Sequence, residues 1–389
     1  MITASVRWRN LGVAAGAATA ALFALFDLYQ WTLAYAGDRF HNDFTFYVAA
    51  ARIGLAHGWG SIYDLSLQQA QLDAMGSRIT IAELARYISP PPVAWLAVPF
   101  TALPYEAAYW TWCALLVAAL AGSWRLAAPE AGRARVIYLV AAIGWLPVIY
   151  GLQLAQPALF VGLGVAASYA LLRANRHLLA GVVLGALALK PQLAFLVPIA
   201  LLAARRNRAF LGSVLSLGAL AALSALALGP GGLGDYQARL EFASGVPVNR
   251  ELTLAYFLGD GPATRAVQVA IAVAAVALAY RTRRRGPEWP YIWALGAGVL
   301  ATPYAHLDDL VMLGLAGWLV IRAGVARWAW LYVLGLVLVI EGEPIWGPAP
   351  VLAGELLSLA LLATAAFRPE PARVAAPREQ PRPQLTMLR

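Results

Sequence analysis

Residues 179–198 read LAGVVLGALALKPQLAFLVP, an apolar run that Lys190 and Pro191 interrupt near its middle. A lysine at the centre of a membrane helix costs roughly 2.5–3.5 kcal/mol to insert, and a proline breaks the helix that it enters. The run therefore predicts a bent pair of membrane helices with a charge at the break. An ionisable residue in such a place indicates a functional site, unless the lysine snorkels to the outer interface.

Apolar runs of this kind recur along the whole chain of 389 residues. Hydrophobic residues make up 61% of it and charged residues 13%, against about 45–50% and about 25% in soluble domains, and the mean hydropathy is +0.66. These values exclude an ordinary soluble enzyme and a soluble protein with a single anchor. We expect one all-α polytopic membrane domain over residues 1–367, with roughly 10–13 membrane segments.

The net charge of +9 comes largely from short arginine clusters between the apolar runs. The clusters form no basic patch interleaved with aromatic residues, so nucleic acid is not an expected partner. Positive clusters favour the cytoplasmic side, which predicts a multi-pass protein of the cytoplasmic membrane with a cytoplasmic N-terminus. Cys113 is the only cysteine, so no intrachain disulfide forms. The first apolar run, 11–35, is too long for a cleavable signal peptide.

The expected membrane segments follow from the positions of the apolar runs. Segment 91–103, bounded by prolines, is predicted to be re-entrant rather than spanning. The expected spans are 11–35, 105–126, 136–152, 157–173, the bent pair 178–189 and 193–204, 209–228, 263–281, 290–303, 308–322, 327–341 and 351–367.

Two segments are polar enough to be loops on the extracytoplasmic side. The first loop, 36–90, contains two expected amphipathic helices, near 44–57 and 64–75, of the kind that lie flat at the interface. The second loop, 229–262, starts with the Gly/Pro turn GPGG. The tail 368–389 is rich in proline and arginine and is predicted to be disordered on the cytoplasmic side.

The first loop opens with GDRFHNDFTFYVAAAR, residues 37–52, which carries acids directly after the first span. A carboxylate held at a membrane surface can act as a general base, although acids also gather at membrane exits simply because they are solvated there. Asp43 is the best placed, since it precedes the helix and the N-terminal dipole would keep it ionised. His41 and Tyr47 flank it.

Three more polar groups interrupt apolar runs. Gln153 and Gln156 lie in YGLQLAQPALF, residues 150–160, and the Lys190 break contains Gln192. The third is TPYAHLDDL, residues 302–310, where histidine and aspartate could ligate a metal but a substrate contact or a helix cap is favoured. Asn249, Arg250 and Glu251 in the second loop are weaker candidates.

Taken together, these features resemble the polyprenol-phosphate-sugar-dependent membrane glycosyltransferases of the GT-C superfamily, closest to the mannosyltransferase-like glycosyltransferase family 87. The order and spacing of several stretches carry the resemblance, rather than any single motif. They are DFTFYVAAARIGLAHG at 43–58, IYD at 62–64, SPPPVAWLAVPFTALP at 89–104, the Gln153–Gln156 turn, residues 179–198 and TPYAHLDDL.

The resemblance implies a GT-C fold and a catalytic carboxylate in the first extracytoplasmic loop, a role that carries over to Asp43. It implies a polyprenyl-phosphate sugar donor, mannose foremost, and a glycolipid or glycan acceptor. Lys190 is the first candidate for the donor phosphate, with Arg250 and His306 behind it. The expected substrate-binding residues are His41, Tyr47, Gln153, Gln156, Gln192, Tyr304, Asp308 and Asp309. NRELTL at 249–254 matches the family's asparagine-containing pattern only loosely.

The expected mechanism is a single displacement that inverts the anomeric centre. A lipid phosphate is a good leaving group, so one base suffices where a glycosidase needs two carboxylates. The departing phosphate needs a cation in a low-dielectric site. We expect no cofactor and no essential metal, because the donor carries one phosphate, although the acids near 308 leave metal dependence open.

Two other classes of function compete with a transferase. A transporter or flippase of lipid-linked sugars predicts paired broken helices in the two halves, whereas the sequence has one, at Lys190. A non-catalytic protein that binds polyprenyl lipids keeps the cationic pocket and makes Asp43 dispensable.

Overall fold

The computed structural model describes residues 2–82, 85–129, 134–324 and 328–367, and this part of the chain is helical without a strand. The tail predicted to be disordered lies outside the described residues. The α-helices are α1 Ile2–Gly37, α2 Asp43–His57, α3 Leu65–Ala74, α4 Pro91–Ala97, α5 Tyr105–Ala127, α6 Ala134–Ile143, α7 Leu146–Gln153, α8 Ala158–Arg173, α9 His177–Val182, α10 Leu196–Ala203, α11 Asn207–Gly245, α12 Ala255–Leu258, α13 Pro262–Arg281, α14 Glu288–Ala301, α15 Val311–Arg322, α16 Trp328–Glu341, α17 Glu343–Trp346 and α18 Pro348–Phe367. Short 3-10 helices are η1 Trp59–Ser61, η2 Val98–Ala102, η3 Val183–Leu189, η4 Pro191–Leu193, η5 Pro247–Arg250 and η6 Leu307–Leu310.

Among the described residues, three helices are long and apolar enough to cross a membrane, namely α5, α11 and α13. The pair α6 and α7, bent by 54°, makes a fourth. Many of the other predicted spans form apolar helices of fewer than 18 residues, such as α14 with 14 and α15 with 12. Large apolar side chains of α11 and α13 point outward, for example Leu226 at 81% and Val269 at 62% exposure, as expected for helices that face lipid.

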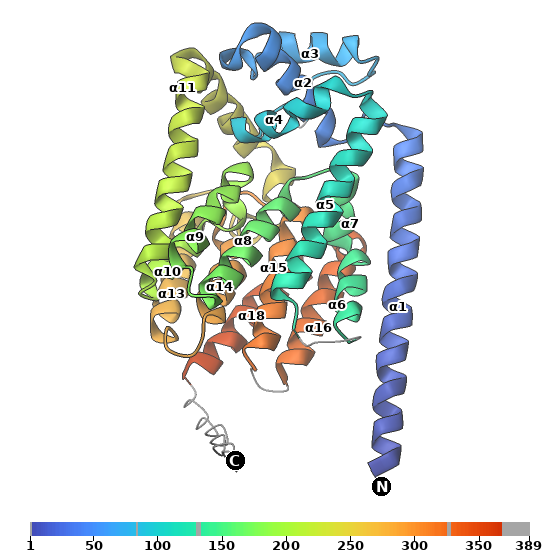
Figure 1. Cartoon of the computed structure of the whole chain (residues 1–389), viewed down its shortest axis with the longest axis vertical. Helices are drawn as coiled ribbons and strands as arrows, with labels where there is room; N and C mark the ends of the chain where they lie inside the picture. Colours follow the sequence, from blue (N-terminus) through green and yellow to red (C-terminus); the bar gives the residue numbers. More distant parts are fainter. Residues whose placement is uncertain (1, 83–84, 130–133, 325–327, 368–389) are drawn as a thin grey trace, which may run out of the picture.

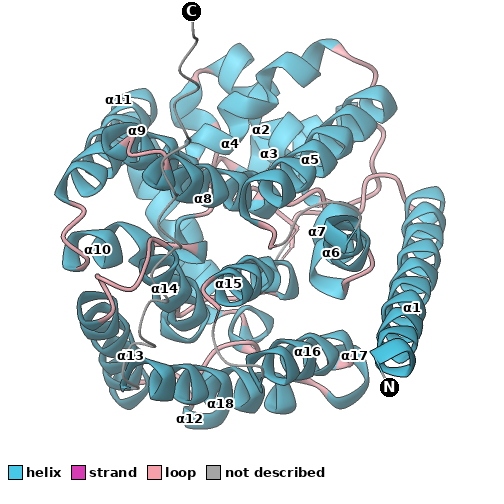
Figure 2. Cartoon of the chain, turned by 60° about the horizontal axis from the view of Figure 1, so that its bottom comes forward, coloured by secondary structure: helices cyan, strands magenta, loops and turns pink. Residues whose placement is uncertain are grey.

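The helices form a bundle with a cap at one end. Helices α2, α3 and α4 make up this cap, while the long helices α1 and α11 run down the flanks toward the opposite end (Figure 1). Figure 2 shows α14 and α15 in the middle of the bundle, with α1 outside the ring of the other helices. Helix α14 is buried over most of its length, so the bundle has its core there.

Helix α2 corrects one prediction. It forms where an amphipathic helix was expected, but ten of its 15 residues are buried, including Phe44 and Ile53. A helix buried to this extent is covered by protein instead of lying half-solvated at an interface. Helices α3 and α4 pack against it. Helix α3 itself buries Gln68 and Leu72.

The Gly/Pro turn predicted at 229 coincides with a kink inside α11, and helical structure continues beyond it to Gly245. Gly229 takes a left-handed conformation, with φ 63°, before Pro230, so the helix kinks there without ending. Beyond the kink, Gly232 lies against the backbone of Gly60 in the cap; a Cβ at this position would be 2.7 Å from the Gly60 carbonyl oxygen. The second half of α11 therefore packs against the cap.

Segment 91–103, which is predicted to be re-entrant, contains no helix long enough to cross a membrane. It forms α4 and η2, and the seven residues of α4 are about 10 Å long. Pro91 starts the helix at a position where the missing N–H costs nothing.

Candidate active site

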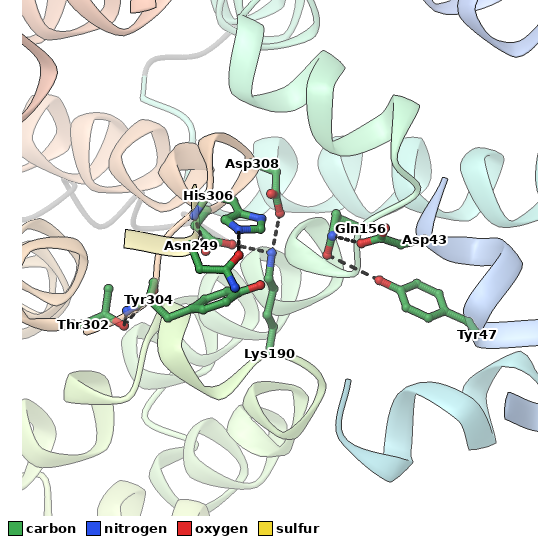
Figure 3. A network of polar contacts seen from close by, with 10 residues as sticks. Asp43, Tyr47, Gln156, Lys190, Asn249, Thr302, Tyr304, His306 and Asp308 are labelled. Carbon is green, nitrogen blue, oxygen red and sulfur yellow. Dashed lines mark hydrogen bonds and ion pairs between the residues drawn. The ribbon is translucent and has the colours of Figure 1, made fainter. Parts of the chain in front are cut away.

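The broken helix predicted around Lys190 is present. Helix η3 ends at Leu189, Lys190 is extended with φ −153°, and η4 starts at Pro191. The lysine does not snorkel to a surface, since only 7% of it is exposed. Its Nζ lies 2.5 Å from Asp308 Oδ2 and 2.5 Å from Asp309 Oδ1 (Figure 3). The break in the chain thus places a cation against two buried carboxylates.

Asp308 and Asp309 belong to the short helix η6, which two hydrogen bonds between His306 and Asp309 close. The His306 N–H donates to Asp309 Oδ2 at 3.0 Å, and the Asp309 N–H donates to the His306 carbonyl oxygen at 3.0 Å. The positive charge of Lys190 offsets the cost of burying the two carboxylates.

A second contact anchors the same turn to η5. The ring Nε2 of His306 lies 2.6 Å from Asn249 Oδ1, and Tyr304 stacks on the imidazole with ring centroids 4.9 Å apart (Figure 3). The Ala305 N–H donates to the Asn249 carbonyl oxygen at 3.1 Å. Burial lowers the pKa of His306 to about 4 even though Asp308 opposes this. The imidazole is therefore neutral near pH 7.

Asp43 lies at the start of α2, next to the turn between α7 and α8. Its N–H donates to the Leu154 carbonyl oxygen at 3.0 Å, and its Oδ2 accepts a hydrogen bond from Gln156 Nε2. The Tyr47 hydroxyl donates to Gln156 Oε1 at 3.4 Å. Gln156 thus joins the cap to the bundle and fixes the orientation of the carboxylate.

The pKa of Asp43 moves in the direction opposite to the sequence prediction. Burial raises it to about 7, the charge of Asp308 adds to this, and Lys190 and the hydrogen bond from Gln156 oppose it. The cost of burying the charge exceeds the benefit of the helix dipole. Because the charges of Asp308 and Lys190 act on the pKa of Asp43, Asp43 lies within electrostatic range of both residues. In the view of Figure 3, Gln156 and Asp43 lie on the side of Lys190 opposite Asn249 and His306.

Several predicted site residues are placed elsewhere. His41 is exposed in the loop before α2. Arg250 forms an ion pair with Asp260, 2.7 Å between Nη1 and Oδ2. Gln153 accepts a hydrogen bond from Tyr109 through its backbone, and its side chain, like that of Gln192, makes no hydrogen bond to the cluster within the described part of the chain. Asn249, which the sequence marked only as a weaker candidate, contacts His306 in the structure. The family's asparagine-containing pattern was the one feature of the sequence that pointed to it.

Among the described residues, no group of three or more histidine, cysteine, aspartate or glutamate side chains is placed to hold a metal ion. The arrangement offers a carboxylate able to take up a proton near neutral pH and, close by, a buried ammonium group. A base next to a cation suits the deprotonation of a hydroxyl and the stabilisation of an anionic leaving group.

The sequence profile described as Glycosyltransferase family 87 matches residues 87–303, more than half of the chain. The chain belongs to glycosyltransferase family 87. It is therefore a membrane glycosyltransferase of the GT-C, polyprenol-phosphate-sugar-dependent family, and the predicted family, fold class and enzyme class are confirmed. The part of the chain that matches family 87 includes Gln156, Lys190 and Asn249, whereas Asp43 and η6 lie outside it. No curated protein and no solved structure gives a significant match.

Proposed function

We propose that this family 87 enzyme moves a sugar, mannose foremost, from a polyprenyl-phosphate donor to a hydroxyl group of a glycolipid or glycan acceptor, with Asp43 as the general base. The observation that carries the proposal is the placement of Asp43, held by Gln156 beside the buried Lys190. A carboxyl group with a pKa near 7 is well matched to proton uptake at neutral pH.

The reaction needs one base and one developing anion. The acceptor hydroxyl oxygen attacks the anomeric carbon, its proton passes to Asp43, and the lipid phosphate departs with the electron pair of the broken bond. Gln156 occupies Asp43 Oδ2 and, among the described residues, none hydrogen-bonds Oδ1, which is the oxygen assigned to the hydroxyl. Attack and departure on opposite sides of the carbon invert the anomeric centre.

Lys190 is the proposed partner of the phosphate. An ammonium group has three N–H donors; two of them face Asp308 and Asp309, and the third is assigned to a phosphate oxygen. The proposal gives Arg250 no part in this, because its charge is matched by Asp260. Tyr47 acts through Gln156, and Tyr304 through its stacking on His306.

The site is proposed to face the extracytoplasmic side. Arg173 and Arg322 both lie over Tyr169, 5.7 Å from the ring centroid, and Arg322 also donates to the carbonyl oxygen of Ala128 just beyond α5. These helix ends lie away from the cap (Figure 1). Because positive residues stay on the cytoplasmic side, the cap and Asp43 belong on the other side.

The test is sugar transfer in membranes that contain the full chain, supplied with a panel of radiolabelled polyprenyl-phosphate sugars. Wild type is compared with Asp43→Asn and with Asp38→Asn, a matched change of an exposed carboxylate in the same loop. Transfer that is lost in Asp43→Asn and kept in Asp38→Asn supports the proposal, and the active donor identifies the sugar. Full activity of Asp43→Asn would refute the assignment of the base. No transfer from any donor by well-folded wild type would favour a transporter or a lipid-binding protein.

A further inference from the structure

The hydrogen bonds of Asn249 define the state of the imidazole beside it. Asn249 is fully buried in η5, and its carboxamide Nδ2 lies 2.6 Å from the carbonyl oxygen of Ala243. A carbonyl oxygen can only accept, so the amide nitrogen must face it. The amide oxygen must then face His306 Nε2, 2.6 Å away. Since an amide oxygen also only accepts, Nε2 carries a proton.

A neutral imidazole has a single N–H, and the hydrogen bond at one nitrogen fixes the state of the other. Burial keeps the His306 ring neutral. The charged and titratable groups around the ring are Asp308, Lys190 and the stacked Tyr304, while Asp309 binds the backbone N–H of His306 rather than its ring. With Nε2 protonated, Nδ1 is the accepting nitrogen. The Asp309 N–H next to it donates to the His306 carbonyl oxygen at 3.0 Å, which leaves the Nδ1 lone pair available.

We propose that Asn249 is a positioning residue that fixes the Nε2–H tautomer of His306, and that His306 Nδ1 accepts a hydrogen bond from a hydroxyl group of the donor sugar or of the acceptor. The second half of this inference rests on the proposed function, whereas the tautomer does not. It changes the role that the sequence suggested for His306: a ring whose only N–H is bound to Asn249 has no donor left for a phosphate.

The first test measures the tautomer in the wild-type protein. The chain has four histidines, so protein labelled with ¹⁵N-histidine gives four imidazole signal sets, and His306→Gln identifies the one that matters. At pH 7 the inference predicts a protonated Nε2 and an unprotonated Nδ1. The reverse tautomer, or a ring protonated at both nitrogens, overturns it. Because the spectrum does not depend on catalysis, this test of the tautomer is independent of the transfer assay.

The second test removes the amide oxygen. Asn249→Leu is expected to lose the fixed tautomer and about tenfold in kcat/KM, the value of roughly one hydrogen bond. Thr253→Val is the matched control, because it deletes buried hydrogen bonds in the same segment without a contact to His306. Asn249→Asp keeps an oxygen against Nε2 and is expected to retain the tautomer. An unchanged tautomer in Asn249→Leu overturns the positioning role.

The third test identifies the partner of Nδ1. Labelled wild type is titrated with polyprenyl phosphate, with each polyprenyl-phosphate sugar of the transfer panel, and with methyl mannoside as a probe of acceptor hydroxyl groups. A change at Nδ1 with a sugar-bearing lipid alone places the hydroxyl on the donor, and a change with methyl mannoside alone places it on the acceptor. Protonation of Nδ1 by sugar-free polyprenyl phosphate, or no change with any of the three, overturns the inference.

Discussion

The site has two halves, Asp43 with Gln156 and Lys190 with Asp308 and Asp309. Both contain aspartates, but the partner of the carboxylates is neutral in the first half and positively charged in the second. Asp43 is buried against the amide of Gln156, which donates a hydrogen bond but carries no charge, whereas Asp308 and Asp309 are buried against the ammonium of Lys190. An amide leaves the carboxyl free to gain and lose a proton, while a cation binds the carboxylates into a fixed unit. The comparison assigns proton transfer to the first half and rigidity to the second.

The largest effect on activity is expected for a substitution of Asp43, in the half without a cation. Asp43→Asn keeps the shape of the side chain and removes the base, so kcat should fall by about 10²–10⁴-fold. The KM for the donor should change little, because the carboxylate does not touch the phosphate. Steady-state transfer rates at varied donor concentration check this. A rise in KM with unchanged kcat would show that Asp43 binds substrate instead of activating the acceptor.

A substitution of Lys190, in the half with the cation, should lower the free energy of unfolding. Lys190→Met leaves Asp308 and Asp309 buried without a partner, and at neutral pH this should cost about 3–5 kcal/mol. The loss should shrink at acid pH, because protonation of the two buried carboxyl groups removes the charge that Lys190 no longer compensates. Unfolding in detergent, followed at several pH values, measures it.

Arg250→Met is the matched control for that change. It breaks a pair in which Asp260 is 49% exposed, so its cost should be about 0–1 kcal/mol. Equal losses in the two variants would show that burial of the Lys190 group contributes nothing.

The pH dependence of kcat/KM tests the role of Asp43 in a second way. Below pH 7 Asp43 is protonated and cannot accept a proton, so kcat/KM should rise with pH through a single ionisation near 7. The hydrogen bond from Gln156 lowers the pKa of Asp43, so Gln156→Leu should move this midpoint to higher pH. Rates measured in both proteins over a common pH series test it, and a midpoint that moves to lower pH would contradict the assignment.

Removal of metal should have a smaller effect still. The Lys190 ammonium lies 2.5 Å from one oxygen of each aspartate and supplies the positive charge beside them. Transfer after dialysis against a chelator should stay within about twofold of the untreated rate. Restoration of a lost activity by added Mg²⁺ or Mn²⁺ would refute the expectation that no metal is essential.

Much of this arrangement could be predicted from the sequence, and the rest could not for physical reasons. The break at Lys190 could be predicted because a charge and a proline inside an apolar run each carry a free-energy cost that local sequence alone reveals. The partners of Lys190 lie more than a hundred residues away in η6, and no local pattern specifies such a pairing. The raised pKa of Asp43 depends on burial of the cap, which a loop sequence does not show. The continuation of α11 past Gly229 depends on its packing against Gly60.

The smallest effect concerns how closely the two halves approach. A Cβ added at Gly151 of α7 would lie 3.3 Å from Asp308 Cβ, and Asp308 cannot easily move because Lys190 holds it. Gly162 of α8 would meet only the flexible end of Met312, at 3.5 Å. Replacing glycine by alanine inside a helix should by itself stabilise by roughly 0.5–1 kcal/mol. Gly162→Ala should therefore raise the unfolding temperature, whereas Gly151→Ala should lose that gain and lower kcat about two- to threefold, a barrier increase of roughly half a kcal/mol. If both variants gained stability equally and kept full activity, η6 would be free to shift, and the rigid role assigned to the Lys190 half would be wrong.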